Sequence, residues 1–125
     1  MQQSTATSQP TDEVRQRVAH GLAMGRLNYD LHDYHEALMH LTDVNAVVQG
    51  YRSIDNWADA RSVKYYLYKS YVMAPERIQG LFKSSVKFLH LEAQVEKDHP
   101  RAVWLVTKLK RTGLRLHELI ERLGH

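Results

Sequence analysis

The amino-acid sequence predicts an all-α protein, an antiparallel bundle of four to five helices that follows a disordered N-terminal tail. Apolar residues recur at alternating spacings of three and four along most of the chain, which places them on one face of a helix. Prolines occur only at positions 10, 75 and 100, and each marks a place where a helix could begin. No segment alternates apolar and polar residues for long enough to form a strand. We therefore expect a tail over residues 1–10 and one domain over residues 11–125.

Five segments carry the helical period. They span residues 12–31, 34–49, 56–73, 75–97 and 100–123. In the fourth segment the spacing predicts one continuous helix with a single buried stripe. That stripe consists of Ile78, Phe82, Val86, Leu89 and Ala93. The fifth segment repeats the four-three spacing throughout, which favours near-antiparallel packing in a left-handed bundle.

Capping residues and small residues support the first three helices. The expected N-caps are Thr11, Asp33, and either Ser53 or Asp55. Gly21 and Gly25 share the apolar face of the first helix. Two small residues at this spacing let another helix approach closely.

Composition and charge limit the classes of function. The chain has 125 residues, no cysteine and a net charge of +3. Residues 1–60 carry 4 Lys/Arg against 8 Asp/Glu, whereas residues 61–125 carry 13 against 6. This asymmetry favours a partner with an anionic face, although the charges of a solvated helical surface explain it equally well. The chain shows neither a secretory signal nor an apolar run of bilayer length, so we expect a cytoplasmic protein.

No motif supports an enzyme. A glycine-rich phosphate loop, a nucleophile elbow and paired catalytic carboxylates are all missing from the sequence. The stretch His32-Asp33-Tyr34-His35-Glu36 brings metal-ligating residue types together. It lies at a helix start without a second cluster, so capping and surface charge explain it better than a metal does. We expect no cofactor.

The strongest candidate binding face lies on the last predicted helix. Arg101, Lys108, Arg111 and Arg115 share one side of it, opposite the apolar stripe, and Trp104 lies among them. An amphipathic ring among cations suits a membrane headgroup layer or a partner protein. The alternative is a solvated face with Trp104 folded against a neighbouring helix.

A second candidate lies on the third predicted helix, where four tyrosines occur within seven residues. The binding residues expected there are Lys64, Tyr65, Tyr68 and Lys69. Exposed tyrosine beside lysine is common at protein interfaces and on single-stranded nucleic-acid platforms. The alternative is that these tyrosines pack in the core with hydrated hydroxyl groups.

Two resemblances to known families add to these observations. The stretch that runs from Met24-Gly25 to Asp33-Tyr34-His35-Glu36-Ala37-Leu38 resembles half of a tetratricopeptide repeat. No second copy follows at a period of 34 residues, which a stable array requires.

The second resemblance rests on Val63-Lys64-Tyr65-Tyr66-Leu67-Tyr68-Lys69, then Met73-Ala74-Pro75, then Leu81-Phe82. This pattern is similar to that of the enterocin A-type bacteriocin immunity proteins. The resemblance implies a cytosolic antiparallel four-helix bundle that protects a cell from its own pore-forming peptide at a membrane-embedded sugar permease. In that family the C-terminal part is usually shorter and less regular than the long helix predicted here.

The sequence thus favours a non-enzymatic binding protein, and most sharply an immunity-like protein that acts from the cytosol, at the inner membrane face, on a membrane receptor complex. One alternative is a helical nucleic-acid-binding or regulatory protein that uses the basic face of the last helix. Another is a tetratricopeptide-like adaptor. No small-molecule substrate is evident from the sequence.

Overall fold

The part of the chain that the structure describes, residues 9–111, is helical throughout apart from its turns and loops. The computed structural model gives α1 (Asp12–Asp30), α2 (Tyr34–Val48), α3 (Ala58–Met73), α4 (Glu76–Val86), α5 (Phe88–Asp98) and α6 (Pro100–Arg111). Side chains are described as far as Leu105. The predicted all-helical bundle is confirmed. Most of the predicted tail, and the predicted continuation of the last helix to residue 123, lie outside the described residues.

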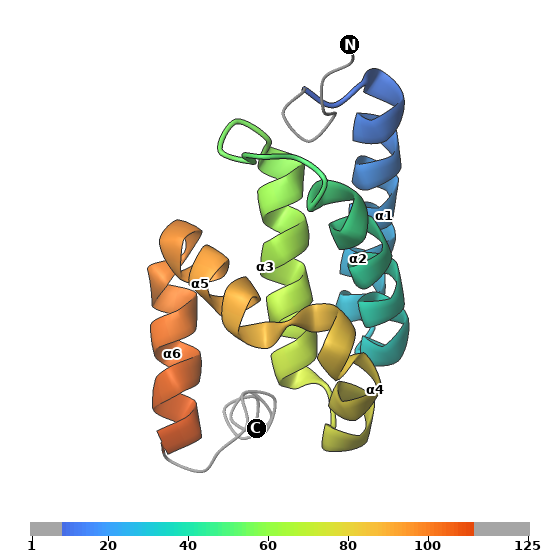
Figure 1. Cartoon of the computed structure of the whole chain (residues 1–125). Coiled ribbons are helices and arrows are strands. Elements are labelled where there is room, and N and C mark those ends of the chain that lie inside the picture. The colour runs from blue at the N-terminus through green and yellow to red at the C-terminus, as the bar shows by residue number, and fades with distance from the viewer. Residues whose placement is uncertain (1–8, 112–125) are drawn as a thin grey trace.

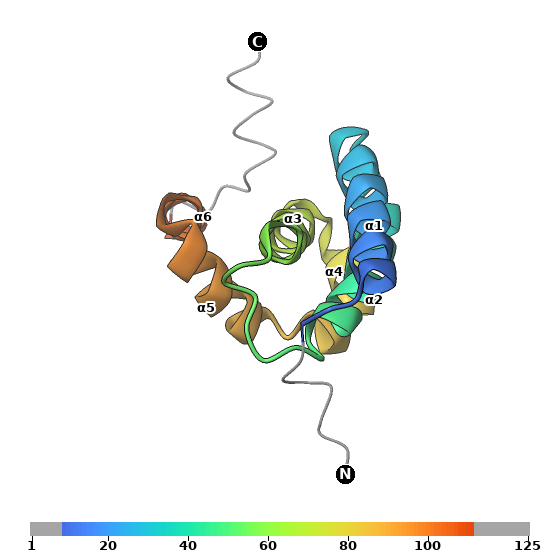
Figure 2. The same ribbon diagram turned by 90° about the horizontal axis from the view of Figure 1, so that it is seen from above.

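The helices are arranged around α3 (Figure 1). The α1–α2 hairpin packs along one side of α3, and α5 crosses the other side. The outermost helix is α6, which packs on α5, so α1 and α6 lie on opposite sides of α3 (Figure 2). None of the described helices combines the length and the apolar character that a membrane span needs.

The first two helices begin at the predicted caps. The hydroxyl oxygen of Thr11 accepts a hydrogen bond of 3.2 Å from the backbone N–H of Val14. At α2, Oδ1 of Asp33 accepts one of 3.2 Å from the N–H of Glu36. Each bond satisfies a backbone donor that has no partner inside its helix.

The predicted start of the third helix is wrong. α3 begins at Ala58, after Trp57, and Trp57 makes no side-chain cap hydrogen bond. Ser53 instead accepts a hydrogen bond from the N–H of Asp55, 3.3 Å away within the loop. The Trp57 ring is 5% exposed and packs edge-on against Tyr51. Burial of this large ring, rather than a polar cap, fixes where the helix starts.

The two glycines of α1 lie directly against α2, as predicted. A Cβ atom at Gly21 would lie 2.0 Å from Cγ1 of Val44, and one at Gly25 would lie 2.4 Å from Cδ2 of Leu41. No larger residue fits at either position without a shift of the surrounding atoms. The hairpin is therefore packed more closely than side chains on both helices would allow.

The predicted continuous helix over residues 75–97 is wrong, because the chain breaks at Lys87. This residue has a left-handed backbone with φ 49° and ψ 64°, and it separates α4 from α5. The break changes which face of the following helix is buried. Leu91 and Val95 enter the core, whereas the predicted stripe residue Leu89 is 77% exposed and Ala93 is also exposed.

Candidate functional site

The outer face of α6 carries exposed apolar side chains beside a cation. Trp104 is 60% exposed and Leu105 is 42% exposed, and Arg101 is exposed as well. Val103, on the inner side of the same helix, is buried. The binding-face hypothesis requires an exposed Trp104 ring, and the ring is exposed. Three further residues predicted for this face lie beyond the described side chains: Lys108, Arg111 and Arg115.

Tyr68, predicted as a surface binding residue, lies instead in the core. Its side chain is fully buried and stacks on Phe88 with ring centroids 5.6 Å apart. The prediction is wrong because α5 packs over this side of α3. Burial, followed by the nearby carboxylates of Glu92 and Glu96, raises the pKa of the Tyr68 hydroxyl well above its usual value.

Lys69 and Tyr65 form part of a cation–π cluster that joins α3 to α1. The Lys69 Nζ atom lies 4.9 Å from the ring centroids of Tyr29 and Tyr65, and 5.3 Å from that of Tyr66. Arg26 of α1 also lies over the Tyr66 ring, 5.1 Å from its centroid. Burial lowers the pKa of Lys69, but the surrounding tyrosines outweigh it, so the net shift is upward. This arrangement holds α3 against α1, and it engages the Lys69 ammonium group in contacts within the protein.

Lys64 lies on a different side of α3 and faces α2. Its Nζ atom donates a hydrogen bond of 2.8 Å to Oδ1 of Asn45, which is buried. Burial lowers the pKa of Lys64. The four residues predicted on α3 therefore do not form one surface, because the helix distributes them among the core, the cluster with α1 and the side facing α2.

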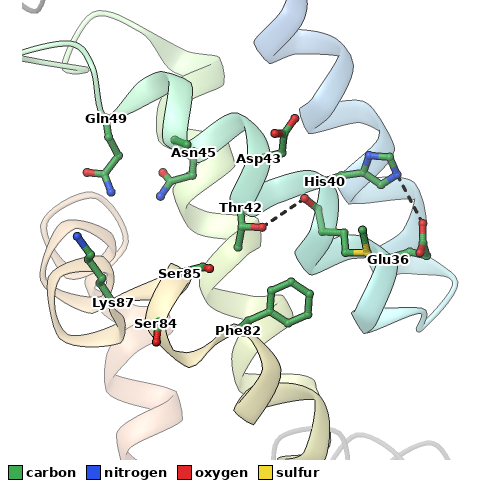
Figure 3. A pocket seen from close by; sticks show the side chains of 12 residues that line it. Glu36, His40, Thr42, Asp43, Asn45, Gln49, Phe82, Ser84, Ser85 and Lys87 are labelled. Atoms are coloured by element: carbon green, nitrogen blue, oxygen red, sulfur yellow. Dashed lines mark hydrogen bonds and ion pairs between the residues drawn. The ribbon is translucent and has the colours of Figure 1, made fainter.

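Three adjoining hollows follow the side of α2 that faces α4 and α5. The largest, about 800 Å³, lies between α2 and α4, where Figure 3 shows Phe82 and Ser85 of α4 across from α2. A cavity of about 220 Å³ lies where α2 and α3 meet the α4–α5 junction. Another, of about 410 Å³, lies between the α2–α3 loop and α5. Gln49 lines all three.

Sequence reasoning missed most of the residues around the smallest cavity. The polar side chains that join Lys64 there are Asn45, Gln49, Lys87, His90 and Gln94. One signal was present in the sequence: Asn45 follows Leu41 by four residues on the apolar face of α2. A polar residue in that position needs a buried hydrogen-bond partner, which Lys64 supplies.

The histidines near the α1–α2 turn do not gather into a metal site. The Glu36 carboxylate lies 3.9 Å from His35 and 3.9 Å from His40. Within residues 9–111, no three His, Cys, Asp or Glu side chains lie close enough together to hold a metal ion.

Comparison with known proteins gave no match: no family model, characterised protein or solved structure is significantly similar to this chain. The candidate sites consequently rest on the residues and geometry described above.

Proposed function

We propose that this protein is a non-enzymatic binding protein that docks a partner protein through the outer face of α6, defined by Arg101, Trp104 and Leu105. The exposed Trp104 ring carries this proposal. Tryptophan and arginine are enriched among the residues that dominate binding energy at protein interfaces. An exposed tryptophan beside arginine is therefore suited to act as an anchor with a cationic rim.

Charge specifies the chemistry of the partner. The half of the chain that includes α6 carries 13 Lys/Arg against 6 Asp/Glu. A partner with an apolar recess surrounded by acidic side chains would accept Trp104 and pair with the arginine. Such charge complementarity raises the association rate and selects the partner orientation.

The sharpest form of this proposal is immunity. The resemblance of residues 63–82 to the enterocin A-type immunity proteins suggests a partner at the cytosolic side of a membrane-embedded sugar permease. The resemblance rests on the motif residues alone, since no family model matches the chain.

A protection assay tests the immunity form. A strain sensitive to pore-forming peptides of the enterocin A type would express the protein and be exposed to a panel of such peptides. We expect protection against at least one peptide, and we expect Trp104→Ala to abolish it. Leu89→Ala is the matched control, because Leu89 is at least as exposed but lies on α5. Loss of an interface anchor removes about 2 kcal/mol or more, roughly a thirtyfold loss of affinity.

Two results would contradict the proposal at different levels. If the wild-type protein protects against no peptide, the immunity form is wrong. If Trp104→Ala protects as well as the folded wild type, the α6 face is not the docking site. Binding to single-stranded or double-stranded nucleic acid that weakens steeply with salt would instead favour the nucleic-acid alternative, because each phosphate contact releases counterions.

A further inference from the structure

The smallest of the three hollows, hereafter the junction cavity, has a buried floor and a polar wall. Val86 and Leu91 form the apolar floor, and both are buried. The wall combines side-chain amides with basic side chains from α2, α3, α5 and the α4–α5 junction. Its polar members are Asn45, Gln49, Lys64, Lys87, His90 and Gln94.

The junction cavity has basic residues but no acidic ones among the described residues that line it. The neighbouring hollows differ in this respect. The wider groove between α2 and α4 includes Glu36 and Asp43. The hollow beside the α2–α3 loop includes Asp55, whose carboxylate already pairs with Lys97 at 3.3 Å. Positive charge therefore has no counter-charge within the described lining of the junction cavity itself, although Lys64 and Lys87 also line the neighbouring hollows that contain acidic residues.

Lys64 is the most informative residue of this cavity. Its side chain is half-buried, which lowers the pKa of its ammonium group, and its described hydrogen-bond partner is the neutral amide of Asn45. Burying a charge is unfavourable unless an opposite charge pairs with it. An anion in the cavity would supply that charge, and it would also accept hydrogen bonds from the side-chain amides.

Lys87 adds a second, independent observation. It holds a left-handed backbone conformation that costs a non-glycine residue about 1–2 kcal/mol. Figure 3 shows its side chain extending from the α4–α5 junction toward Gln49. Strained residues of this kind often lie at functional sites, where the surrounding structure holds them in place. Here the strain places a second ammonium group at the edge of the junction cavity.

We propose that the junction cavity binds the phosphoryl group of a small phosphorylated molecule, between the ammonium groups of Lys64 and Lys87. This site is separate from the α6 face and does not depend on it. A phosphomonoester carries a charge of roughly −1.5 to −2 at neutral pH, which two lysines match. Planar carboxylates are best recognised by the forked guanidinium of arginine, whereas lysine binds phosphate as a point charge. The cavity contains two lysines and, among its described lining residues, no arginine.

The adjoining groove indicates where the rest of the ligand lies. A volume of about 220 Å³ is smaller than the roughly 300–1,000 Å³ of pockets that enclose drug-sized ligands. The junction cavity shares Asn45, Gln49 and Lys87 with the wider groove, in which Met39 and Phe82 provide apolar surface. The organic part of the ligand extends into this groove and contacts those two side chains.

Nuclear magnetic resonance titration of the full chain at constant ionic strength tests the proposal. The probes are inorganic phosphate, phenyl phosphate and acetate. We expect saturable binding of both phosphates, with shifts of the side-chain amide signals of Asn45, Gln49 and Gln94. Phenyl phosphate should also shift the signals of Met39 and Phe82. Acetate should bind at least about tenfold more weakly than phosphate.

Matched lysine variants separate a built site from general charge attraction. Lys64→Met and Lys87→Met should each weaken phosphate binding by about tenfold or more, because each removes a charged hydrogen-bond donor. Lys83→Met is the control, since it removes the same charge from a position on α4 that lines none of the three hollows. If Lys64→Met does not fold, Lys87→Met alone tests the proposal, because the Lys87 side chain is exposed.

Several outcomes would overturn the proposal. Binding that does not saturate, or that falls equally in all three variants, would show only charge attraction. Acetate affinity equal to that of phosphate would contradict the phosphoryl assignment. Phenyl phosphate binding without any change at Met39 and Phe82 would show that the organic part does not enter the groove.

Discussion

The side chain of Val44 occupies the space beside Gly21 in which any other residue would place its Cβ atom. The distance from that position to Cγ1 of Val44 is 2.0 Å, shorter than any ordinary van der Waals contact. Close packing of α1 on α2 thus depends on the absence of a side chain at residue 21. The same is true at Gly25, which faces Leu41.

Gly21→Ala should destabilise the protein although alanine is the better helix former. The helix-propensity gain is about 1 kcal/mol, whereas overpacking a core costs about 1–3 kcal/mol and more when backbone must move. We expect a net loss of up to roughly 2 kcal/mol in the free energy of unfolding, measured by urea denaturation. Gly80→Ala in α4 is the control, because a Cβ atom at that position would meet nothing within 4 Å. That variant should be stabilised by about 0.5–1 kcal/mol. Equal effects at the two positions would contradict the packing argument.

Lys87→Gly should raise the free energy of unfolding, by up to about 1 kcal/mol. Glycine adopts the left-handed conformation of residue 87 without the steric cost that lysine meets, which outweighs its greater freedom in the unfolded chain. Lys83→Gly, in the last turn of α4, should lower the same quantity by up to about 1 kcal/mol, because glycine is unfavourable at a helical position. If the Lys→Gly substitution raises the free energy of unfolding at residue 87 but lowers it at residue 83, four residues earlier, the helix break is verified. Loss of stability in both variants would indicate a continuous helix.

Tyr68→Phe should change how stability depends on pH above about 10. In the unfolded chain tyrosine loses its proton near pH 10, whereas the raised pKa of Tyr68 keeps the folded form protonated to higher pH. The unfolded state then binds fewer protons, so stability is intact below pH 10 and falls by at most about 1.4 kcal/mol per pH unit above it. Tyr68→Phe removes this contribution. Denaturation curves between pH 8 and 11 should therefore fall less steeply for the variant.

The same variant should be at least as stable as wild type at neutral pH. No described residue makes a hydrogen bond of good geometry with the buried Tyr68 hydroxyl, although the Glu92 carboxylate lies close enough to help raise its pKa, and a buried hydroxyl without a well-formed hydrogen bond costs about 1–3 kcal/mol. A variant markedly less stable than wild type at pH 7 would show that the hydroxyl has a partner.

Periodicity and local signals were sufficient to predict most of the fold. The caps at Thr11 and Asp33 and the close approach at Gly21 follow from residue chemistry within one or two turns. The break at Lys87 could not be predicted in this way, because lysine carries no turn signal and the apolar spacing continues through it. The break accompanies the packing of α5 on α3 and the burial of Leu91 and Val95, and this packing is tertiary.

The sites were less predictable than the fold. The exposure of Trp104 follows from its place opposite the apolar face of one helix. Three residues of α3 lie in different surroundings because different helices cover its sides: Lys64, Tyr68 and Lys69. No local sequence pattern predicts which helix covers which side. The junction cavity combines residues from α2 to α5 that are up to 49 positions apart, from Asn45 to Gln94.

The two tryptophans should differ sharply in their access to solvent, and this difference tests the surface on which the docking proposal depends. Trp57 is 5% exposed and Trp104 is 60% exposed. Trp57→Phe leaves Trp104 as the single tryptophan, and Trp104→Phe leaves Trp57. In the first variant, fluorescence emission should lie at long wavelength and be strongly quenched by acrylamide; in the second, emission should be blue-shifted and weakly quenched. Circular dichroism should show both variants folded.

Shielding of Trp104 that grows with protein concentration would identify a second copy of the chain as the occupant of the α6 face. Shielding at every concentration would mean that the face is covered within the molecule, and the docking proposal would be wrong.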